Sequence, residues 1–360
     1  MKELYLGVMS GTSLDGVDVA LCEIDDASCK LIASYEHPFP KPLKEEILTL
    51  LANKTTLKAV GTLDVKLGKL FAEAINRLIK REKLLRENIK AIGLHGQTLW
   101  HEPNAEYPFS MQLGNANVVL ADTCIDVVSD FRGADIANSG QGAPFAPAFH
   151  QFLFHSSCAT AVVNIGGMSN ITLIDGDALT GYDMGCGNVL MDAYISLTQG
   201  KAYDREGAFA KSGEVIKELL RAMLADEYFQ KEPPKSTGRE YFNTAWLEKY
   251  LSRKSNPADI QRTLLELTAV TISQAINSSH ATKAIICGGG AKNTFLIERL
   301  QTLCKYPVQT SDANGINGDF LEAMLFAWLA KKRVHKEVVA LKEVTGAKKD
   351  TISGAIYAKS

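Results

Sequence analysis

Hydrophobic and polar positions alternate along this chain in blocks that predict an α/β protein. Near the N-terminus, two apolar, strand-like runs flank nine residues rich in Gly, Ser, Thr and Asp, so residues 4–24 are predicted to form a β-hairpin. A third strand is expected over 30–36. Apolar residues then recur at helical spacing over 63–81, and this period predicts a helix with one core-facing side.

The rest of the pattern predicts short strands that alternate with helices. Further helices are expected over 43–52, 114–121, 189–197, 264–278 and 294–303. Further strands are expected over 89–94, 125–129 and 283–287. The tail, 345–357, is expected to return to the N-terminal part of the chain. The charged middle section carries little specific signal, although residues 239–242 are of a kind that could line a pocket.

The opening pattern returns in the second half of the chain. Residues 161–175 are again predicted as strand, polar turn and strand, with Gly-Gly-Met-Ser where the first hairpin has Gly-Val-Met-Ser. This is a weak internal repeat at about 160 residues, the size of one domain. We therefore predict two lobes that face one another across a central cleft. The first lobe is predicted to contain residues 1–137 and 338–360, and the second residues 138–337.

The turn of the first hairpin has the chemistry of an anion site. Small residues let the backbone approach a ligand closely, and successive N–H groups can form a concave cradle for phosphate. Asp15 and Asp18 lie in or beside this turn, and carboxylates next to a phosphate imply a bridging Mg2+. An ordinary hairpin with a polar turn explains the same residues. The second Gly-Met-Ser turn, and the triple-Gly turn over 288–290, favour the phosphate interpretation.

Polar residues also follow two predicted strands, at the strand ends where open α/β sheets place ligands. His95 and Gln97 follow one of them, although a single His is more often structural. Arg132 follows the other. Its guanidinium suits a substrate carboxylate, and it could equally pair with Asp130 or Asp135 in a loop.

Asp183 is the candidate catalytic carboxylate. It stands among Gly181, Gly185 and Gly187 and is expected to be presented to a ligand at a helix start. Helix capping would also explain an Asp in this region, but Asp183 lies several residues too early for a simple cap. Asp192, one turn into the helix, is expected on its solvated face.

Composition narrows the classes of function. The formal net charge is −2 and no Lys- or Arg-rich run stands out, which argues against binding of nucleic acid or of an acidic membrane surface. The seven cysteines are scattered without C-x2-C spacing, so neither a zinc site nor a disulfide framework is indicated. Because the sequence has no signal-peptide pattern and no long apolar run, we expect a cytoplasmic protein.

Taken in order, the motifs resemble one family, the anhydro-N-acetylmuramic acid kinases, which belong to the wider sugar kinase, heat-shock protein and actin ATPase group. The resemblance covers essentially the whole chain. It is carried by Gly7–Asp18, His95–Thr98, Asp130–Arg132, Asn164–Gly167, Gly181–Asn188, Cys287–Asn293 and Gly318–Ala330. It implies an α/β, two-lobed actin-like ATPase (ribonuclease H-like) fold with a central cleft.

The resemblance also implies an activity. Such an enzyme uses ATP and water to open the 1,6-anhydro ring of anhydro-N-acetylmuramic acid and phosphorylates O6, giving N-acetylmuramic acid 6-phosphate and ADP in cell-wall recycling. By this resemblance Asp183 is the general base, and Arg132 meets the lactyl carboxylate of this small-molecule sugar. The implied sugar contacts are His95, Gln97 and Glu322. The family further implies Mg2+ as a cofactor and a homodimer.

The residues expected to hold ATP come from three turns. They are Gly11, Thr12, Ser13, Leu14, Asp15, Gly16, Val17 and Asp18 in the first hairpin, Gly166 and Gly167 in the second, and Gly288, Gly289 and Gly290 in the third turn. Asp15 and Asp18 are the expected Mg2+ ligands. Many members of the wider fold have an Asp where Asn164 stands here, as it usually does in the kinase family. Metal support then falls to Asp15, Asp18 or Asp183.

Three other functions are compatible with parts of the sequence. A chaperone or filament-type ATPase of the same fold would share the paired hairpins, but it has no use for His95, Arg132 or the Gly-flanked Asp183. An ATP-dependent sugar sensor would bind without turnover, and an intact Asp183 argues against it. A kinase acting on a different sugar is the third alternative, for which Arg132 favours an acidic substrate.

Overall fold

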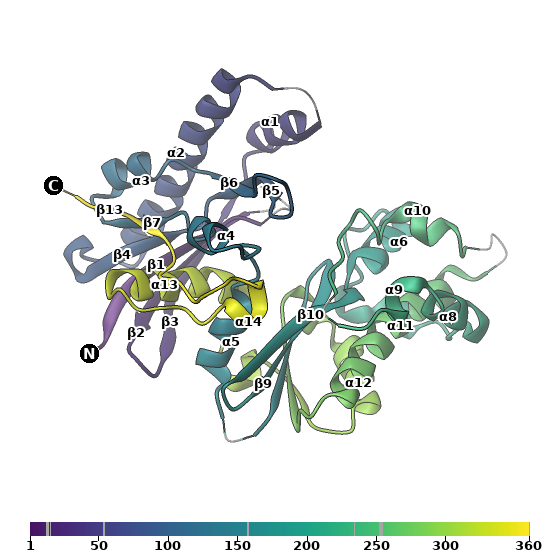
Figure 1. Cartoon of the computed structure of the whole chain (residues 1–360). Helices are drawn as coiled ribbons and strands as arrows, with labels where there is room; N and C mark the ends of the chain where they lie inside the picture. Colours follow the sequence, from purple (N-terminus) through teal and green to yellow (C-terminus); the bar gives the residue numbers. More distant parts are fainter. Residues whose placement is uncertain are drawn as a thin grey trace. The chain divides into compact units, whose positions relative to one another are not determined.

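The computed structural model describes residues 1–11, 14, 16–52, 55–156, 158–233, 235–251 and 255–359. The chain divides into two compact units, which Figure 1 shows in full. Unit 1 comprises Met1–Leu153 and Phe320–Ser360, and unit 2 comprises Phe154–Asp319. Residues 138–153 and 320–337, predicted in the second lobe, therefore belong to unit 1. Across the described ranges, no helix combines the length and the apolar character that crossing a lipid bilayer requires.

Unit 1 is built on a six-stranded sheet with the order β13-β7-β4-β1-β2-β3. β1 (Glu3–Met9), β2 (Gly16–Ile24) and β3 (Cys29–Pro38) form the predicted antiparallel meander. β4 (Ile89–Leu94) and β7 (Val127–Ser129) run parallel to β1. The predicted return of the tail is confirmed, because β13 (Ala355–Tyr357) pairs with β7.

Helices cover both faces of this sheet. On one face, α2 (Leu57–Arg81) and α3 (Ala116–Thr123) share a buried apolar cluster with alternate residues of β1 and β2. On the other face lies α13 (Leu321–Val334), which approaches β1 and β4 so closely that Gly7 and Gly93 have no room for a side chain. This packing places α13 in unit 1. The remaining helices of the unit are α1 (Lys41–Ala52), α4 (Gly133–Ala137), α5 (Ala146–Phe154) and α14 (Lys342–Thr345).

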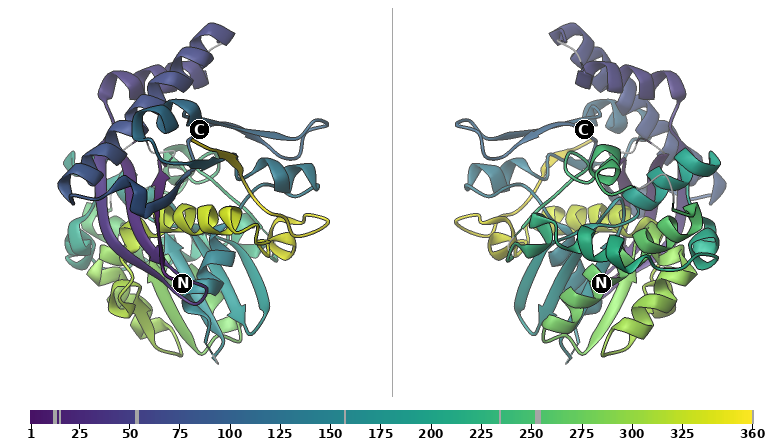
Figure 2. Two further views of the ribbon diagram at one scale, coloured as in Figure 1. Left: turned by 90° about the vertical axis from the view of Figure 1, so that its left-hand side faces the viewer. Right: turned by 90° about the vertical axis from the view of Figure 1, so that its right-hand side faces the viewer.

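The segment before residue 154 also belongs to unit 1 because its aromatic side chains pack on α13. Phe149 and Phe152 lie with their ring centres 5.5 and 5.6 Å from that of Trp328. A two-stranded ribbon completes the unit, formed by β5 (Gln97–Glu102) and β6 (Phe109–Leu113). Figure 2 shows this ribbon extending away from the six-stranded sheet.

Unit 2 repeats the strand plan of unit 1. Its order, β10-β9-β8-β11-β12, matches β3-β2-β1-β4-β7 strand for strand, with an antiparallel meander followed by parallel strands. The strands are β8 (Thr160–Ile165), β9 (Met168–Asp175), β10 (Ala178–Cys186), β11 (Lys283–Cys287) and β12 (Val308–Thr310). The weak repeat in the sequence thus corresponds to two sheets of one topology, and the predicted α/β, ribonuclease H-like class is confirmed.

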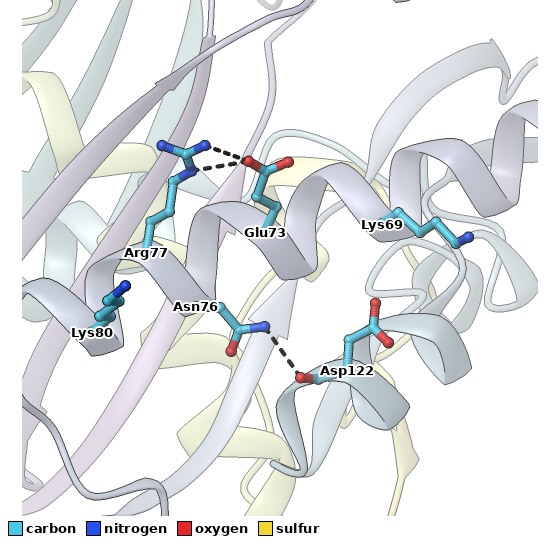
Figure 3. A pocket seen from close by; sticks show the side chains of 6 residues that line it. All are labelled: Lys69, Glu73, Asn76, Arg77, Lys80 and Asp122. Atoms are coloured by element: carbon cyan, nitrogen blue, oxygen red, sulfur yellow. Dashed lines mark hydrogen bonds and ion pairs between the residues drawn. The ribbon is translucent and has the colours of Figure 1, made fainter.

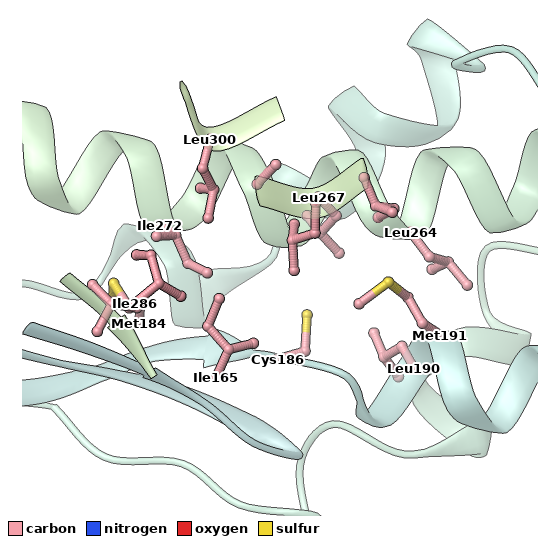
Figure 4. Close-up of a cluster of buried hydrophobic side chains, with 14 of the residues drawn as sticks. Ile165, Met184, Cys186, Leu190, Met191, Leu264, Leu267, Ile272, Ile286 and Leu300 are labelled. Atoms are coloured by element: carbon pink, nitrogen blue, oxygen red, sulfur yellow. The ribbon is translucent and has the colours of Figure 1, made fainter. Parts of the chain in front are cut away.

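The core of unit 2 lies between its sheet and α11 (Pro257–Ser278). Figure 4 shows Leu264, Leu267 and Ile272 of this helix facing Ile165 and Ile286 of the sheet. The other helices are α6 (Val189–Gln199), α7 (Ala208–Lys211), α8 (Lys217–Leu224), α9 (Glu227–Gln230), α10 (Thr244–Glu248) and α12 (Thr294–Leu303). Short 3-10 turns occur at Arg86–Asn88, Arg205–Gly207, Gly289–Lys292, Asp312–Asn314 and Gly318–Phe320.

Two elements differ from their predictions in ways that matter for the site. Asp183 lies inside β10, well before α6 begins, so its predicted place at a helix start was wrong. Asp192 is half-buried on α6, where a solvated position was expected. The other elements that were predicted differ only in their bounds. For example, α2 begins six residues early because the Thr56 hydroxyl accepts a hydrogen bond from the Ala59 N–H at 3.1 Å.

Candidate active site

The first predicted phosphate turn joins β1 to β2 in unit 1. Met9 and Asp18 are the last residues paired across the hairpin, so the turn projects from the sheet end. Leu14 and Val17 are buried in the core, which anchors the turn and leaves their backbone as the part that can meet a ligand. Gly11, Gly16 and the half-buried Asp18 are also described. The expected ATP-binding residues Thr12, Ser13 and Asp15 lie outside the described residues.

Beside this turn, a buried hydrogen bond fixes Gln97. The Ser10 hydroxyl donates to Gln97 Oε1 at 2.7 Å, and Gln97 is 2% exposed. The predicted sugar contact Gln97 is therefore held by a residue of the opening hairpin. Sequence reasoning did not assign this role to Ser10, because nothing in the pattern links two positions so far apart in the chain.

His95 and Arg132 form a second pair in unit 1. Arg132 Nη2 lies 3.0 Å from His95 Nε2, and Arg132 Nη1 donates to the Gly142 carbonyl at 3.0 Å. Burial, together with the positive charge of Arg132, lowers the pKa of His95 to about 3, so the imidazole is neutral and its Nε2 accepts from the guanidinium. Arg132 makes no ion pair with Asp130 or Asp135 in the described structure, which removes that structural explanation of the residue.

Glu322 lies in the first turn of α13, the helix whose Phe326 ring packs 4.6 Å from the His95 ring. Part of Glu322 stays exposed, yet protein surrounds much of its carboxyl group. The resulting loss of hydration raises the pKa of Glu322, and the positive charge of Arg132 lowers it. Arg132 in turn has its pKa lowered by burial and raised by Glu322. The structure thus brings together the predicted sugar contacts of unit 1.

Asp183 is held in unit 2 by backbone groups of a distant segment. Its N–H donates to the Lys235 carbonyl at 3.0 Å, and its Oδ2 accepts from the Thr237 N–H at 3.0 Å. The Tyr228 hydroxyl donates to the Asp183 carbonyl at 2.8 Å. Burial raises the pKa of the Asp183 carboxyl, the Thr237 hydrogen bond lowers it, and the charge of Glu240 raises it again.

The glycines of the second and third turns fall into two groups, those packed closely against β8 and those that face open space. A Cβ on Gly288 would lie 2.2 Å from Asn164 Oδ1, and one on Gly290 would lie 2.3 Å from Ile165, so close packing on β8 requires both. A Cβ on Gly166 or Gly289 would meet no atom closer than 3.6 Å. These two positions keep open space in which a ligand can approach the backbone.

The turn after β8 is also fixed in place by the start of α6. The Gly167 carbonyl accepts from the N–H groups of Gly187 and Val189 at 2.8 and 3.1 Å, and the Gly166 carbonyl accepts from that of Asn188 at 2.8 Å. A prearranged turn of this kind does not have to become ordered when an anion binds. The predicted ATP-binding glycines of unit 2 therefore form one rigid group.

The residues present can fit a magnesium ion. Within the described part of the chain, no cluster of three or more His, Cys, Asp or Glu side chains is placed to hold a metal. Mg2+ in kinase sites, however, is commonly held by one or two carboxylates together with water and phosphate oxygens. Asp18, at the described edge of the first turn, can supply such a carboxylate.

A separate depression of about 420 Å³ lies on the surface of unit 1 along α2. Figure 3 shows the polar side chains that line it, among which Arg77 pairs with Glu73 and the Asn76 amide donates to the Asp122 carbonyl at 3.2 Å. None of the predicted site residues lines it. Because it lacks the predicted site residues and holds an ordinary surface pair between Arg77 and Glu73, we assign it no part in the reaction.

Comparison with known proteins identifies the family to which this chain belongs. Residues 3–359 match the family model of anhydro-N-acetylmuramic acid kinase. The kinase of that name from Sulfurovum sp. is 56% identical over 99% of both chains, and that from Sulfurimonas denitrificans is 53% identical over 99% of this chain and all of its own. A solved structure, component A of the Acidaminococcus fermentans (R)-2-hydroxyglutaryl-CoA dehydratase, is 12% identical over 92% of this chain and 99% of its own, with a TM-score of 0.48. On the family match and these two relatives, the chain belongs to the anhydro-N-acetylmuramic acid kinase family.

Proposed function

We propose that Asp183 is the general base with which this kinase of anhydro-N-acetylmuramic acid activates water. The family's reaction consumes ATP, opens the 1,6-anhydro ring and leaves the phosphate on O6, giving N-acetylmuramic acid 6-phosphate and ADP for peptidoglycan recycling. Water must lose a proton as it attacks the anomeric carbon, and O6, released from that carbon, takes the phosphoryl group. The attack of water on the anomeric carbon requires at least one ionised carboxylate that can accept the proton.

The main support for this role is the environment of the Asp183 carboxyl group. One oxygen accepts a hydrogen bond from the Thr237 N–H, and no other hydrogen bond to the carboxylate occurs in the described structure, which leaves its second oxygen for a substrate. The raised pKa brings the carboxylate nearer to the pH at which a base works best. A buried Asp with a purely structural role would be expected to have both oxygens hydrogen-bonded within the protein.

For the phosphoryl transfer, we propose that the three turns hold the phosphates of ATP. The open positions at Gly166 and Gly289 favour backbone contact, and the small residues of the first turn would supply further backbone contacts. Asp18, with Asp15 of the same turn, would hold Mg2+, which supplies positive charge that neutralises the phosphates when bound. The residues themselves do no covalent chemistry here, because phosphoryl transfer depends chiefly on positioning and charge.

For the sugar, we propose His95, Gln97, Arg132 and Glu322 as contacts. Neutral His95 accepts a hydrogen bond from Arg132 and so orients the guanidinium. Arg132 Nε has no partner in the described structure, although it is buried, and an unsatisfied buried donor favours a ligand acceptor. The lactyl carboxylate of the sugar has the charge and shape that this guanidinium would bind.

The test is a coupled assay with purified protein, ATP and Mg2+, run with and without anhydro-N-acetylmuramic acid. We expect ADP release to depend on the sugar and to yield a 6-phosphosugar identified by mass spectrometry, and we expect chelation of Mg2+ to abolish it. N-acetylmuramic acid and anhydro-N-acetylglucosamine, which lacks the lactyl group, serve as matched substrate controls. Release of inorganic phosphate at one rate with every sugar would refute the assignment.

Arg132→Ala is expected to raise KM for the muramic sugar by about 100-fold and to change KM for ATP by less than about twofold. The reason is that loss of a charge-assisted, two-pronged contact costs about 2–3 kcal/mol of binding. Arg132→Lys, which keeps the charge without the fork, should lie between the two. Initial rates at varied concentrations of each substrate measure this, and an equal rise in both KM values would contradict carboxylate recognition.

Glu240→Gln is expected to move the acidic limb of the kcat profile to lower pH. The negative charge of Glu240 raises the pKa of Asp183, so its removal lowers that pKa and keeps the base ionised further into acid. Glu232→Gln is the matched control, because Glu232 is also exposed nearby but does not act on Asp183. A shift toward higher pH, or an equal shift in both variants, would argue against Asp183 as the titrating group.

We also propose a cytoplasmic homodimer. Consumption of ATP supports the compartment. Exposed apolar side chains on the β5–β6 ribbon support association, since Trp100, Tyr107, Phe109 and Met111 are between 39% and 79% exposed. Light scattering coupled to size exclusion should give twice the 39.2 kDa mass of one chain, and a mass that stays at 39.2 kDa over a wide concentration range would overturn the dimer.

A further inference from the structure

One segment of unit 2 carries both the anchor of Asp183 and an unpaired arginine. We call residues 235–240 the strap. Its Lys235 carbonyl and Thr237 N–H make the two backbone hydrogen bonds to Asp183 already described. Lys235 itself is tied down, because its ammonium donates to the Lys231 carbonyl at 2.8 Å. The strap is therefore fixed to the edge of β10 by its first residues.

Two residues beyond Thr237, the strap places Arg239 over the second phosphate turn. A Cβ built on Gly167 would lie 3.5 Å from Arg239 Nη2 and 3.6 Å from Nε, so the guanidinium lies against this glycine. These distances correspond to ordinary van der Waals contact. The bare glycine thus leaves both the turn backbone and the face of the guanidinium accessible.

No hydrogen bond or ion pair within the described structure accounts for the position of the Arg239 side chain. The residue is exposed, and its guanidinium makes no hydrogen bond or ion pair with any described residue. Most exposed arginines extend into water or pair with a neighbouring carboxylate. Here the side chain stays at the turn, with all five of its N–H donors available.

Asp192 of α6 carries a negative charge that acts on Arg239. The two side chains interact electrostatically, and Arg239 lowers the pKa of the half-buried Asp192, which burial raises to about 6 overall. Asp192 makes no side-chain hydrogen bond of its own in the described structure. Asp204, the other carboxylate that acts on it, is engaged by the N–H groups of Phe209 and Ala210.

We propose that Arg239 binds the terminal phosphate of ATP and that Asp192 is its positioning residue. The proposal rests on the proposed function, in which the turn at Gly166–Gly167 faces phosphate and Asp183 faces the sugar. The strap is hydrogen-bonded to Asp183 and its arginine lies against Gly167, the turn that holds the transferred group in the proposed function. The planar guanidinium fork matches two phosphate oxygens.

During transfer, the bond between the terminal phosphorus and the ADP oxygen breaks as the bond to sugar O6 forms. Arg239 gives up no proton in this step, because its guanidinium stays charged throughout. It neutralises the charge that spreads over the three oxygens of the moving group. Its effect is therefore expected on the nucleotide that carries the terminal phosphate and on kcat, and not on the affinity for sugar.

The experiment compares Arg239→Ala, Arg239→Lys and the control Arg221→Ala, which removes the same charge from an exposed position on α8. Calorimetry measures the binding of ADP and of a non-hydrolysable ATP analogue, and steady-state kinetics give kcat and both KM values. For Arg239→Ala we expect about 10-fold weaker binding of the ATP analogue, unchanged ADP binding and a kcat at least about 100-fold lower. Arg239→Lys should recover most of the binding and little of kcat, and Arg221→Ala should match the wild type.

Other results of this experiment would contradict different parts of the proposal. An unchanged kcat in Arg239→Ala would overturn the proposal, and an equal loss of ADP and ATP-analogue binding would overturn the assignment to the terminal phosphate. Asp192→Asn should lower kcat in the wild type but add nothing to Arg239→Ala, and additive losses would refute the positioning role. A wild-type protein without sugar-dependent turnover would instead refute the proposed function.

Discussion

Asp183→Asn is expected to lower kcat about a thousandfold while leaving ATP binding unchanged, the largest catalytic loss among the proposed site residues. The substitution keeps the shape and the Thr237 hydrogen bond, because an amide oxygen also accepts from that N–H. What it removes is the ability to take a proton from water, and a positioned general base contributes about 100- to 10,000-fold to rate. Steady-state kinetics, with calorimetry of ATP binding, measure the two effects separately.

Asp175→Asn is the matched control for this prediction. Asp175 ends β9 in the same hairpin and is exposed, so the same chemical change there should leave kcat unaltered. The residual activity of Asp183→Asn should also lose the acidic limb that Asp183 gives to the wild type. A near-normal kcat would move the search for the base to Glu322, whose pKa is also raised by its surroundings.

The sequence was sufficient for the two hairpins because both carry local signals. Apolar alternation and small polar turns lie within a few residues of one another, so β1, β2, β8 and β9 follow from pattern alone. Asp183 could be proposed for the same local reason, being flanked by glycines. The strand conformation of Asp183 could not be predicted in this way. A strand that ends just before a helix has a sequence much like that of a loop leading into the helix.

The contacts that set the chemistry could not be read from the chain. Thr237 holds the Asp183 carboxylate through a backbone N–H, and every residue except Pro has such a group. Asp192 was expected in solvent because its position on α6 says nothing of what packs beside that helix. Burial and charge act between segments distant in the sequence, and they decide which carboxylates have raised pKa values.

The boundary of unit 1 also depends on contacts between segments that are distant in the sequence. α13 follows the second repeat in sequence, so it was predicted with the second lobe. Its place is determined by two glycines, Gly7 on β1 and Gly93 on β4, which lie far from it in the chain and let its backbone approach the sheet. A glycine in a strand can also mark a turn or a bulge, and only the packed structure distinguishes these uses.

Gly7→Ala is accordingly expected to destabilise the protein by about 3 kcal/mol or more, at or beyond the upper end of typical overpacking costs. An added Cβ would lie 1.8 Å from the Ala323 carbonyl oxygen and 2.6 Å from the Ala327 nitrogen. Both are backbone atoms of α13, so relief requires the whole helix to move and carries Glu322 with it. Gly93→Ala meets the Phe326 carbonyl oxygen at 1.9 Å and should behave alike.

Gly61→Ala makes the same chemical change as Gly7→Ala, but we expect it to stabilise the protein. Gly61 lies within α2 with nothing within 4 Å of an added Cβ, so alanine there should stabilise the helix by about 0.5–1 kcal/mol. Thermal unfolding of the three variants beside the wild type measures both signs. Failure of Gly7→Ala to yield folded protein, while Gly61→Ala melts at or above the wild-type temperature, agrees with the close approach. A Gly7→Ala protein as stable as the wild type would show that α13 does not lie against β1 in this way.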